Sequence, residues 1–315
     1  MAHDHHDDHH GHGHGMAEDL PRFEALLARR RMLQWFAGAG TAALVAGCGG
    51  GSGSSSSDSV SVVSGSTSTA TPTPTATSTP TPTATPTPTA TSTSSSGCVA
   101  AASETNGPYP ADGTNSSSGS TSNVLTSSGI VRSDIRSSFI SSTTTATGVQ
   151  LQITLALVNV NSSCAPLSGY AIYIWCCDRQ GLYSLYTLPA ESYLRGVQVT
   201  DSNGQVTFTL IFPGCYSGRW PHIHFEVYSS LTNATSGRYA TLISQLALPA
   251  DICTTVYADT TTYPSSSRNF TQIGSLSSDN VFGDNTTAQN SAMTPALTGS
   301  TSAGYIGTAT IGLAL

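Results

Sequence analysis

Apolar and polar positions alternate with a period of two over several stretches of the chain. The clearest stretch is residues 148–160, in which one face carries Val149, Leu151, Ile153, Leu155 and Leu157. Because neighbouring side chains of a strand point to opposite faces, this pattern predicts a strand with one buried face. Further strands are predicted over residues 167–175, 205–212, 222–228 and 305–315.

Turn-forming residues separate the predicted strands. Asp201-Ser202-Asn203-Gly204 and Phe212-Pro213-Gly214 combine residue types that favour tight turns. Beyond the N-terminal leader, residues 1–47, no stretch has a convincing helical period. We therefore expect residues 98–315 to form one all-β domain with the architecture of an antiparallel β-sandwich.

The N-terminal leader contains signals for export and lipidation in the expected order. A run rich in His, Asp and Gly (residues 1–15) is either native or an engineered tag, and residues 29–34 (RRRMLQ) fit a twin-arginine signal. The apolar stretch that follows is too short and too rich in glycine for a membrane span. It ends in Leu44-Val45-Ala46-Gly47-Cys48, which resembles a bacterial lipobox.

These signals predict an exported lipoprotein. We expect residues 1–47 to be removed and Cys48 to carry acyl chains that attach the protein to a membrane on its periplasmic or extracellular side. The alternative is an uncleaved anchor followed by a cysteine that is there by chance. Residues 48–97 are almost entirely Ser, Thr, Gly, Pro and Ala. They have little apolar surface to offset the entropy cost of ordering, so we expect a disordered tether.

The charge balance argues against nucleic acid as a partner. The chain has no lysine, and its 11 basic residues stand against 18 acidic residues, which gives a formal net charge of −7. This composition cannot form the basic stripe that a phosphate backbone requires.

Six of the seven cysteines follow Cys48, and an even number in an exported domain predicts disulfides of undetermined connectivity. Cys176 and Cys177 are adjacent on a predicted strand, so their side chains should point to opposite faces and have different partners. In a competing interpretation one of these two cysteines is a metal ligand beside the histidines, in a zinc or copper site. An oxidising compartment argues against such free thiolates.

Residues 214–225 contain the densest group of chemically active side chains. His222 and His224 are the only histidines outside the leader, and on a strand both imidazoles would lie on one face and could reach one metal ion. The alternative is two partly exposed histidines with no ligand. Tyr216 and Arg219 in the same segment favour a site.

Six motifs, spread in order over the expected domain, carry a family resemblance. They are ETNGPY (104–109), VRSDIR (131–136), CAPLSG (164–169), WCCDRQGLYS (175–184), YLRGVQVTD (193–201) and YSGRWPHIHF (216–225). The chain resembles the intradiol ring-cleavage dioxygenases, in the exported branch related to protocatechuate 3,4-dioxygenase. The last motif is the most specific, because its spacing of tyrosine, arginine and histidine is typical of that family.

The resemblance implies a mononuclear non-haem Fe(3+) centre. Carried over residue by residue, its ligands are Tyr183, Tyr216, His222 and His224. Phenolates are hard anionic donors that stabilise iron(III), and the ion lowers the pKa of a bound phenol so that it can ligate near neutral pH. Taken without the resemblance, Tyr183 is better interpreted as an aromatic residue that covers the core of the sheet.

The resemblance also implies the reaction, which is O2-dependent cleavage of a catechol-type ring between its two hydroxyl-bearing carbons to a cis,cis-muconate-type product. Tyr216 would leave the iron on substrate binding and act as a general base. Arg219 would stabilise charge on the ring. Gln245 falls where the family has a glutamine near the oxygen-binding side, and Tyr109 falls in a motif that borders the substrate pocket. Family members are often oligomeric, which is compatible with a homo-oligomer here.

Two positions depart from the family pattern. Position 176 is commonly histidine and position 215 commonly a bulky aromatic residue, but both are cysteine here. Since both lie beside expected ligands, we hypothesise a Cys176–Cys215 disulfide. The rival function is a tethered β-sandwich lipoprotein that binds a sugar, a protein partner or a metal without ring cleavage.

Overall fold

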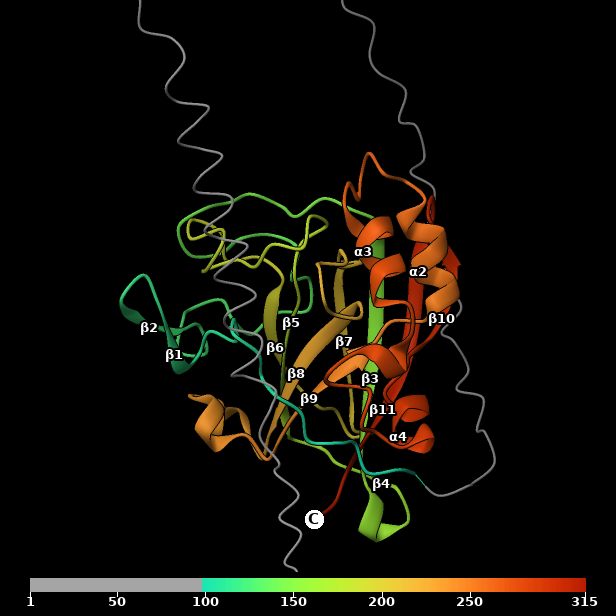
Figure 1. Ribbon diagram of the computed structural model, residues 1–315. Coiled ribbons are helices and arrows are strands. Elements are labelled where there is room, and N and C mark those ends of the chain that lie inside the picture. Colours follow the sequence, from blue (N-terminus) through green and yellow to red (C-terminus); the bar gives the residue numbers. More distant parts are fainter. Residues whose placement is uncertain (1–97) are drawn as a thin grey trace, which may run out of the picture. The chain divides into compact units, whose positions relative to one another are not determined.

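Two β-sheets form the framework of the part of the chain that this computed structural model describes, residues 98–315 (Figure 1). The five-stranded sheet contains β3 (Gln150–Asn159), β4 (Ala165–Pro166), β7 (Gln205–Ile211), β10 (Ala296–Ser300) and β11 (Gly304–Leu313). The four-stranded sheet has the order β6 (Arg195–Val199), β5 (Ala171–Trp175), β8 (His222–Tyr228) and β9 (Leu242–Ala247). A separate hairpin consists of β1 (Asp112–Ser117) and β2 (Ser120–Asn123). The mainly β class is confirmed, whereas the expected signal segment, the lipidated Cys48 and the tether lie outside the described residues.

The long strand β3 organises the five-stranded sheet. It pairs antiparallel with β7 and with the two-residue strand β4, and parallel with β11. The parallel pairing differs from the expectation of an antiparallel sandwich. A period of two shows which face of a strand is buried and says nothing about its direction, and the long segment between β3 and β11 allows the crossover that parallel strands need.

The main core lies between the inner faces of the two sheets. Leu151, Ile153, Leu155 and Leu157 of β3 are all buried, as the alternating pattern predicts. They belong to one cluster with the apolar residues of the opposing sheet, which include Ile172, Ile174, Ile223, Phe225 and Val227. This packing of apolar faces confirms the sandwich arrangement.

The four-stranded sheet is buried on its outer face as well. All residues of β8 are buried, so His222, His224, Glu226 and Tyr228 lie under other parts of the chain rather than in solvent. A second apolar cluster covers this face, with Val124, Leu125 and Ile130 from the segment that follows β2. The two histidines therefore lie in a closed layer between the sheet and its covering loops.

Three short helices correct the expectation that the domain has no helix. They are α2 (Ala250–Tyr257), α3 (Ser266–Ile273) and α4 (Thr287–Ala292), and single 3-10 turns lie at Val160–Ser162, Leu231–Asn233, Gly237–Tyr239 and Leu276–Ser278. Each helix is shorter than the window in which a helical period can be recognised. Helix α4 is fixed locally instead, by a capping box between Thr286 and Gln289. No helix within residues 98–315 has the length and apolar character to cross a membrane.

One disulfide, Cys98–Cys164, is present in the described residues, and Cys176, Cys177, Cys215 and Cys253 are free and buried. The hypothesised Cys176–Cys215 disulfide is therefore wrong. The Cys215 thiol lies 3.6 Å from the carbonyl oxygen of Arg219, and Cys176 packs as an apolar residue in the main core. Cys176 and Cys177 do point to opposite sides of the sheet, because Cys177 belongs to the outer cluster.

The burial of β3 yields a testable prediction. Replacing the fully buried Ile153 by alanine should lower the free energy of unfolding by about 2–5 kcal/mol, because it leaves a cavity between the sheets. The matched control is Ile306→Ala in the neighbouring strand β11, where the side chain is 61% exposed, and its effect should stay within about 0.5 kcal/mol. Urea unfolding measures both, and equal losses would contradict the assigned faces.

Candidate metal centre

Four side chains bring their donor atoms together above the outer face of the four-stranded sheet. His222 and His224 come from β8, Tyr183 from the loop between β5 and β6, and Tyr216 from the loop between β7 and β8. His222 Nε2 lies 3.0 Å from His224 Nε2 and 3.1 Å from the Tyr216 hydroxyl. The Tyr183 hydroxyl lies 3.5 Å from His222 Nε2 and 3.3 Å from His224 Nε2. The expected ligand set thus converges on one point.

The spacing of these donors fits a metal ion. Donors that each lie about 2.1 Å from an ion, at angles of about 90–110°, are separated by about 3.0–3.4 Å. The four measured separations run from 3.0 to 3.5 Å. Two phenol oxygens and two imidazole nitrogens can together hold a ferric ion, since phenolate is a hard donor.

The competing metal site with a cysteine ligand is not present. No group of three or more His, Cys, Asp or Glu side chains in residues 98–315 is placed to hold a metal ion. The Cys177 thiol instead donates to the carbonyl oxygen of Gly214 at 3.3 Å. Tyrosine, and not cysteine, therefore completes the donor set around the two histidines.

His222 is held in the tautomer that a metal ligand needs. Its Nδ1 lies 2.5 Å from the carbonyl oxygen of Trp220, so Nδ1 carries the proton and Nε2 presents its lone pair to the other donors. Burial, together with the Arg219 cation, lowers the pKa of His222 to about 3. Burial also holds the pKa of His224 well below its usual value. Both imidazoles are therefore neutral at physiological pH.

His224 is fixed by the packing of Trp175 and Gly107 against its ring. It stacks on Trp175, its cross-strand neighbour, with ring centroids 4.7 Å apart and planes inclined by 5°. At Cε1 of the ring the backbone of Gly107 approaches so closely that a Cβ there would lie 3.1 Å from this atom. Gly107 also has a φ of +70°, so any side chain at this position would be strained. The glycine of the ETNGPY motif thus allows the N-terminal segment to lie against the imidazole.

The two tyrosines are neutral phenols unless a cation is present. Burial raises the pKa of Tyr183 well above its usual value, and burial also raises the pKa of Tyr216. A highly charged ion at this point reverses the preference, because it stabilises phenolate over phenol. Tyr216 is partly exposed whereas Tyr183 is 2% exposed, so the two phenols differ in their access to solvent.

Arg219 lies beside the donor cluster in a buried network. Its guanidinium donates to Asp279 Oδ2 at 2.9 Å and to Gln245 Oε1 at 2.7 Å. Gln245 is the cross-strand neighbour of His224, and its Nε2 donates to the carbonyl oxygen of Thr105 at 2.9 Å. Burial acts to raise the pKa of Asp279, but Arg219 and several hydrogen bonds outweigh it and hold the pKa below its ordinary value. Arg219 is therefore a fixed cation.

Asp279 was not predicted from the sequence. It lies 60 residues after Arg219, in a segment without any recognised motif. Besides Arg219 it accepts hydrogen bonds from the backbone of Trp220, Val281 and Phe282. Only the fold reveals that this carboxylate orients Arg219 and fixes the backbone next to His222.

Arg195 is a second residue whose role emerges only from the structure. Its fully buried guanidinium donates to the carbonyl oxygens of Tyr109, Pro110 and Ser184 and to the Ser184 and Tyr173 hydroxyls, at 2.9–3.0 Å. It thereby joins the segment that carries Tyr109 to the loop that carries Tyr183. The ring of Tyr109 lies against Tyr183, with centroids 5.1 Å apart, so Tyr109 does border the cluster.

A scan against protein-family models found no match, and a search of curated proteins found none either. Solved structures of intradiol ring-cleavage dioxygenases are similar to the chain. One from Tetranychus urticae is 24% identical over 69% of this chain and 95% of that chain, with a TM-score of 0.48. The dioxygenase domain of a fusion protein from Streptomyces sp. SirexAA-E is 22% identical over 60% and 96%, with a TM-score of 0.37. 3-Chlorocatechol 1,2-dioxygenase from Rhodococcus opacus 1CP is 16% identical over 60% and 68%, with a TM-score of 0.38.

The Arg219–Asp279 pair yields a second prediction. Asp279→Ala should lower the free energy of unfolding by about 3–5 kcal/mol, because it leaves the buried Arg219 cation without its carboxylate. The matched control is Asp134→Ala, which breaks the exposed pair with Arg136 and should cost at most about 1 kcal/mol. Urea unfolding of both variants measures the difference, and a small effect at both positions would show that Arg219 does not depend on Asp279.

Proposed function

We propose that the chain is a non-haem iron(III) dioxygenase that cleaves catechol-type rings between the two hydroxyl-bearing carbons with O2, giving cis,cis-muconate-type products. The observation that carries this proposal is the convergence of two phenol oxygens and two imidazole nitrogens, of which four pairs lie 3.0–3.5 Å apart. The six ordered motifs resemble those of the intradiol dioxygenases, and this resemblance favours the interpretation of the four side chains as iron ligands.

The donor set favours iron(III) as the resident metal. Two tyrosinates and two neutral histidines would give the site two negative charges, which suits a hard trivalent ion better than a soft or monovalent one. When bound, the ferric ion would act as a Lewis acid that draws electron density from a chelated catechol and so makes the ring reactive toward O2. The residues that would hold it are Tyr183, Tyr216, His222 and His224.

Tyr216 is the ligand best placed to exchange with substrate. It is partly exposed, whereas Tyr183 and both histidines are about 2% exposed. Tyr216 would give way to a catechol oxygen and would accept the catechol proton on its Oη. Burial raises the pKa of the Tyr216 phenol, so its phenolate would be a strong base. Tyr183 stays in place, because its backbone N–H and the adjacent Ser184 carbonyl are hydrogen-bonded.

Arg219 and Gln245 would act on the ring and on O2. The guanidinium cannot move away, since Asp279 and Gln245 both bind it, and a fixed cation beside the cluster stabilises negative charge as it develops on the ring. Gln245 lies next to His224 across the sheet and is fixed between Arg219 and Thr105. Tyr109 would form an aromatic wall of the substrate pocket.

The rival binding-module hypothesis leaves the donor cluster unexplained. A sugar- or partner-binding β-sandwich has no need for two buried tyrosines that converge on two buried neutral histidines. We therefore favour the dioxygenase. Export through the twin-arginine signal and attachment through Cys48 complete the proposal, and they rest on the sequence signals alone.

The proposal predicts a ferric tyrosinate chromophore and ring cleavage. After reconstitution with iron(III), the purified chain should show a broad visible absorption band that shifts when catechol is added. With O2 it should form a muconate-type product. Tyr216→Phe should reduce kcat by about 10²–10⁴-fold, since it removes both a ligand and the proton acceptor. Tyr239→Phe is the matched control, because Tyr239 is 64% exposed, and it should leave the spectrum and kcat unchanged.

A chain that stays colourless after reconstitution, or that forms no ring-opened product, would contradict the proposal. A coloured chain in which Tyr216→Phe keeps both the band and the rate would instead remove Tyr216 from the centre.

A further inference from the structure

Residues 98–110, here called the N-terminal strap, run from the end of the five-stranded sheet to the metal centre. Near its start, Ala101 N donates to the carbonyl oxygen of Gly312 in β11 at 2.9 Å. The strap then follows the edge strand β9, where Glu104 N donates to the Ile243 carbonyl and the Ser244 hydroxyl to the Ala102 carbonyl. It is therefore held by single hydrogen bonds rather than by a continuous strand ladder.

The far end of the strap forms one side of the metal centre. The Thr105 carbonyl binds Gln245, and Gly107 lies against the His224 ring. The Tyr109 carbonyl accepts from Arg195, and the Tyr109 ring packs on Tyr183. The orientation of a histidine, a tyrosine and the Arg219-bound glutamine therefore depends on where the strap lies.

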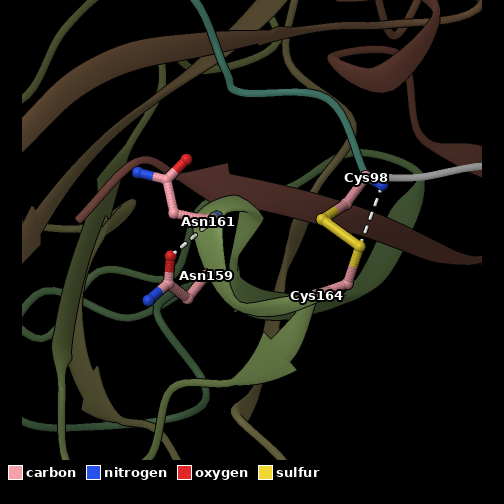
Figure 2. The surroundings of a disulfide bond; sticks show 4 residues. All are labelled: Cys98, Asn159, Asn161 and Cys164. Carbon is pink, nitrogen blue, oxygen red and sulfur yellow. Dashed lines mark hydrogen bonds between the residues drawn. A yellow bond between two sulfur atoms is a disulfide. The ribbon is translucent and has the colours of Figure 1, made fainter.

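The near end of the strap is tied down covalently. Figure 2 shows the Cys98–Cys164 disulfide, which joins the first described residue to the turn that follows β3. This turn is itself ordered, since the Asn159 side chain caps Asn161 N at 2.9 Å and Asn161 Nδ2 donates to the Leu315 carbonyl at 2.8 Å. Both disulfide cysteines are partly exposed, whereas the four free cysteines are buried.

From Cys98 to Glu104 the strap makes only isolated backbone hydrogen bonds, and a segment held in this way opens locally unless one of its ends is fixed. We propose that the Cys98–Cys164 disulfide is a positioning element of the metal centre, which keeps the strap closed over His224 and Tyr183. Its effect on turnover rests on the proposed function, but its effect on the strap does not.

Formation of the Cys98–Cys164 disulfide removes two protons and two electrons from the two thiols. They pass to the disulfide of a thiol-oxidising protein, which becomes a dithiol. The centre is then completed only where such an oxidant acts.

Hydrogen exchange with mass spectrometry tests the proposal on the full chain. In the double variant Cys98→Ser/Cys164→Ser, amides of residues 99–110 should exchange about tenfold faster or more, because the strap opens locally. Amides of β8 should keep their wild-type rates. The matched control is Asn161→Ala, which removes the hydrogen bond to Leu315 in the same turn and leaves the disulfide intact. It should leave exchange in the strap unchanged.

Folded wild-type protein provides a second route if the double variant does not fold. Mild treatment with dithiothreitol, followed by alkylation, should modify Cys98 and Cys164 and none of the other four described cysteines, because those four are buried. After removal of the reagents, exchange in the strap should rise as in the double variant.

The iron-loaded protein gives the second readout. A chelator should remove iron about tenfold faster from the reduced and alkylated protein than from the untreated protein, since the strap no longer supports His224. Unchanged exchange in residues 99–110 after the disulfide is lost would overturn the proposal, whatever metal the protein holds. Faster exchange in a chain that binds no iron would uphold the role of the disulfide in holding the strap and contradict the proposed function instead.

Discussion

The buried guanidinium of Arg195 is the interaction on which the arrangement of the site depends. It has no carboxylate within ion-pair distance in residues 98–315, so its desolvation is offset by hydrogen bonds to the strap and to the loop that carries Tyr183. Three non-glycine residues next to this network have a left-handed backbone. Ala111 follows Pro110, Leu185 follows Ser184, and Leu194 precedes Arg195. Such conformations cost about 1–3 kcal/mol each and persist only where the surroundings enforce them. The covering loops are therefore held in place by Arg195 against their local preference.

Burial of the outer face of the four-stranded sheet determines the chemistry. It keeps His222 and His224 neutral and Tyr183 and Tyr216 protonated, so the metal-free cluster has no net charge. A trivalent cation can ionise both phenols and so obtain two anionic ligands. The Arg219–Asp279 pair adds a fixed cation whose own charge is balanced. The result is a site whose charge and donor atoms suit a hard cation.

Part of the fold and part of the candidate site could be predicted from the sequence. The alternation in β3 and the run His222–Tyr228 gave correct strands, because one-sided burial and β-rich composition leave a local pattern. Strand β9 was not predicted, since it is buried on both faces and shows no alternation. The partners of Arg219 and Arg195 could not be found, because Asp279 and the carbonyls of Tyr109 and Pro110 are distant in sequence. Counting cysteines overestimated the disulfides, since the core uses four thiols as apolar side chains.

Ligation of iron by the two tyrosines and two histidines is tested most directly by diffraction from crystals of the iron-loaded chain, with data collected at the iron absorption edge. We predict one anomalous peak between the hydroxyls of Tyr183 and Tyr216 and the Nε2 atoms of His222 and His224. An iron-loaded crystal without a peak at this point, or with the metal bound by cysteine sulfur, would contradict the assignment of the centre.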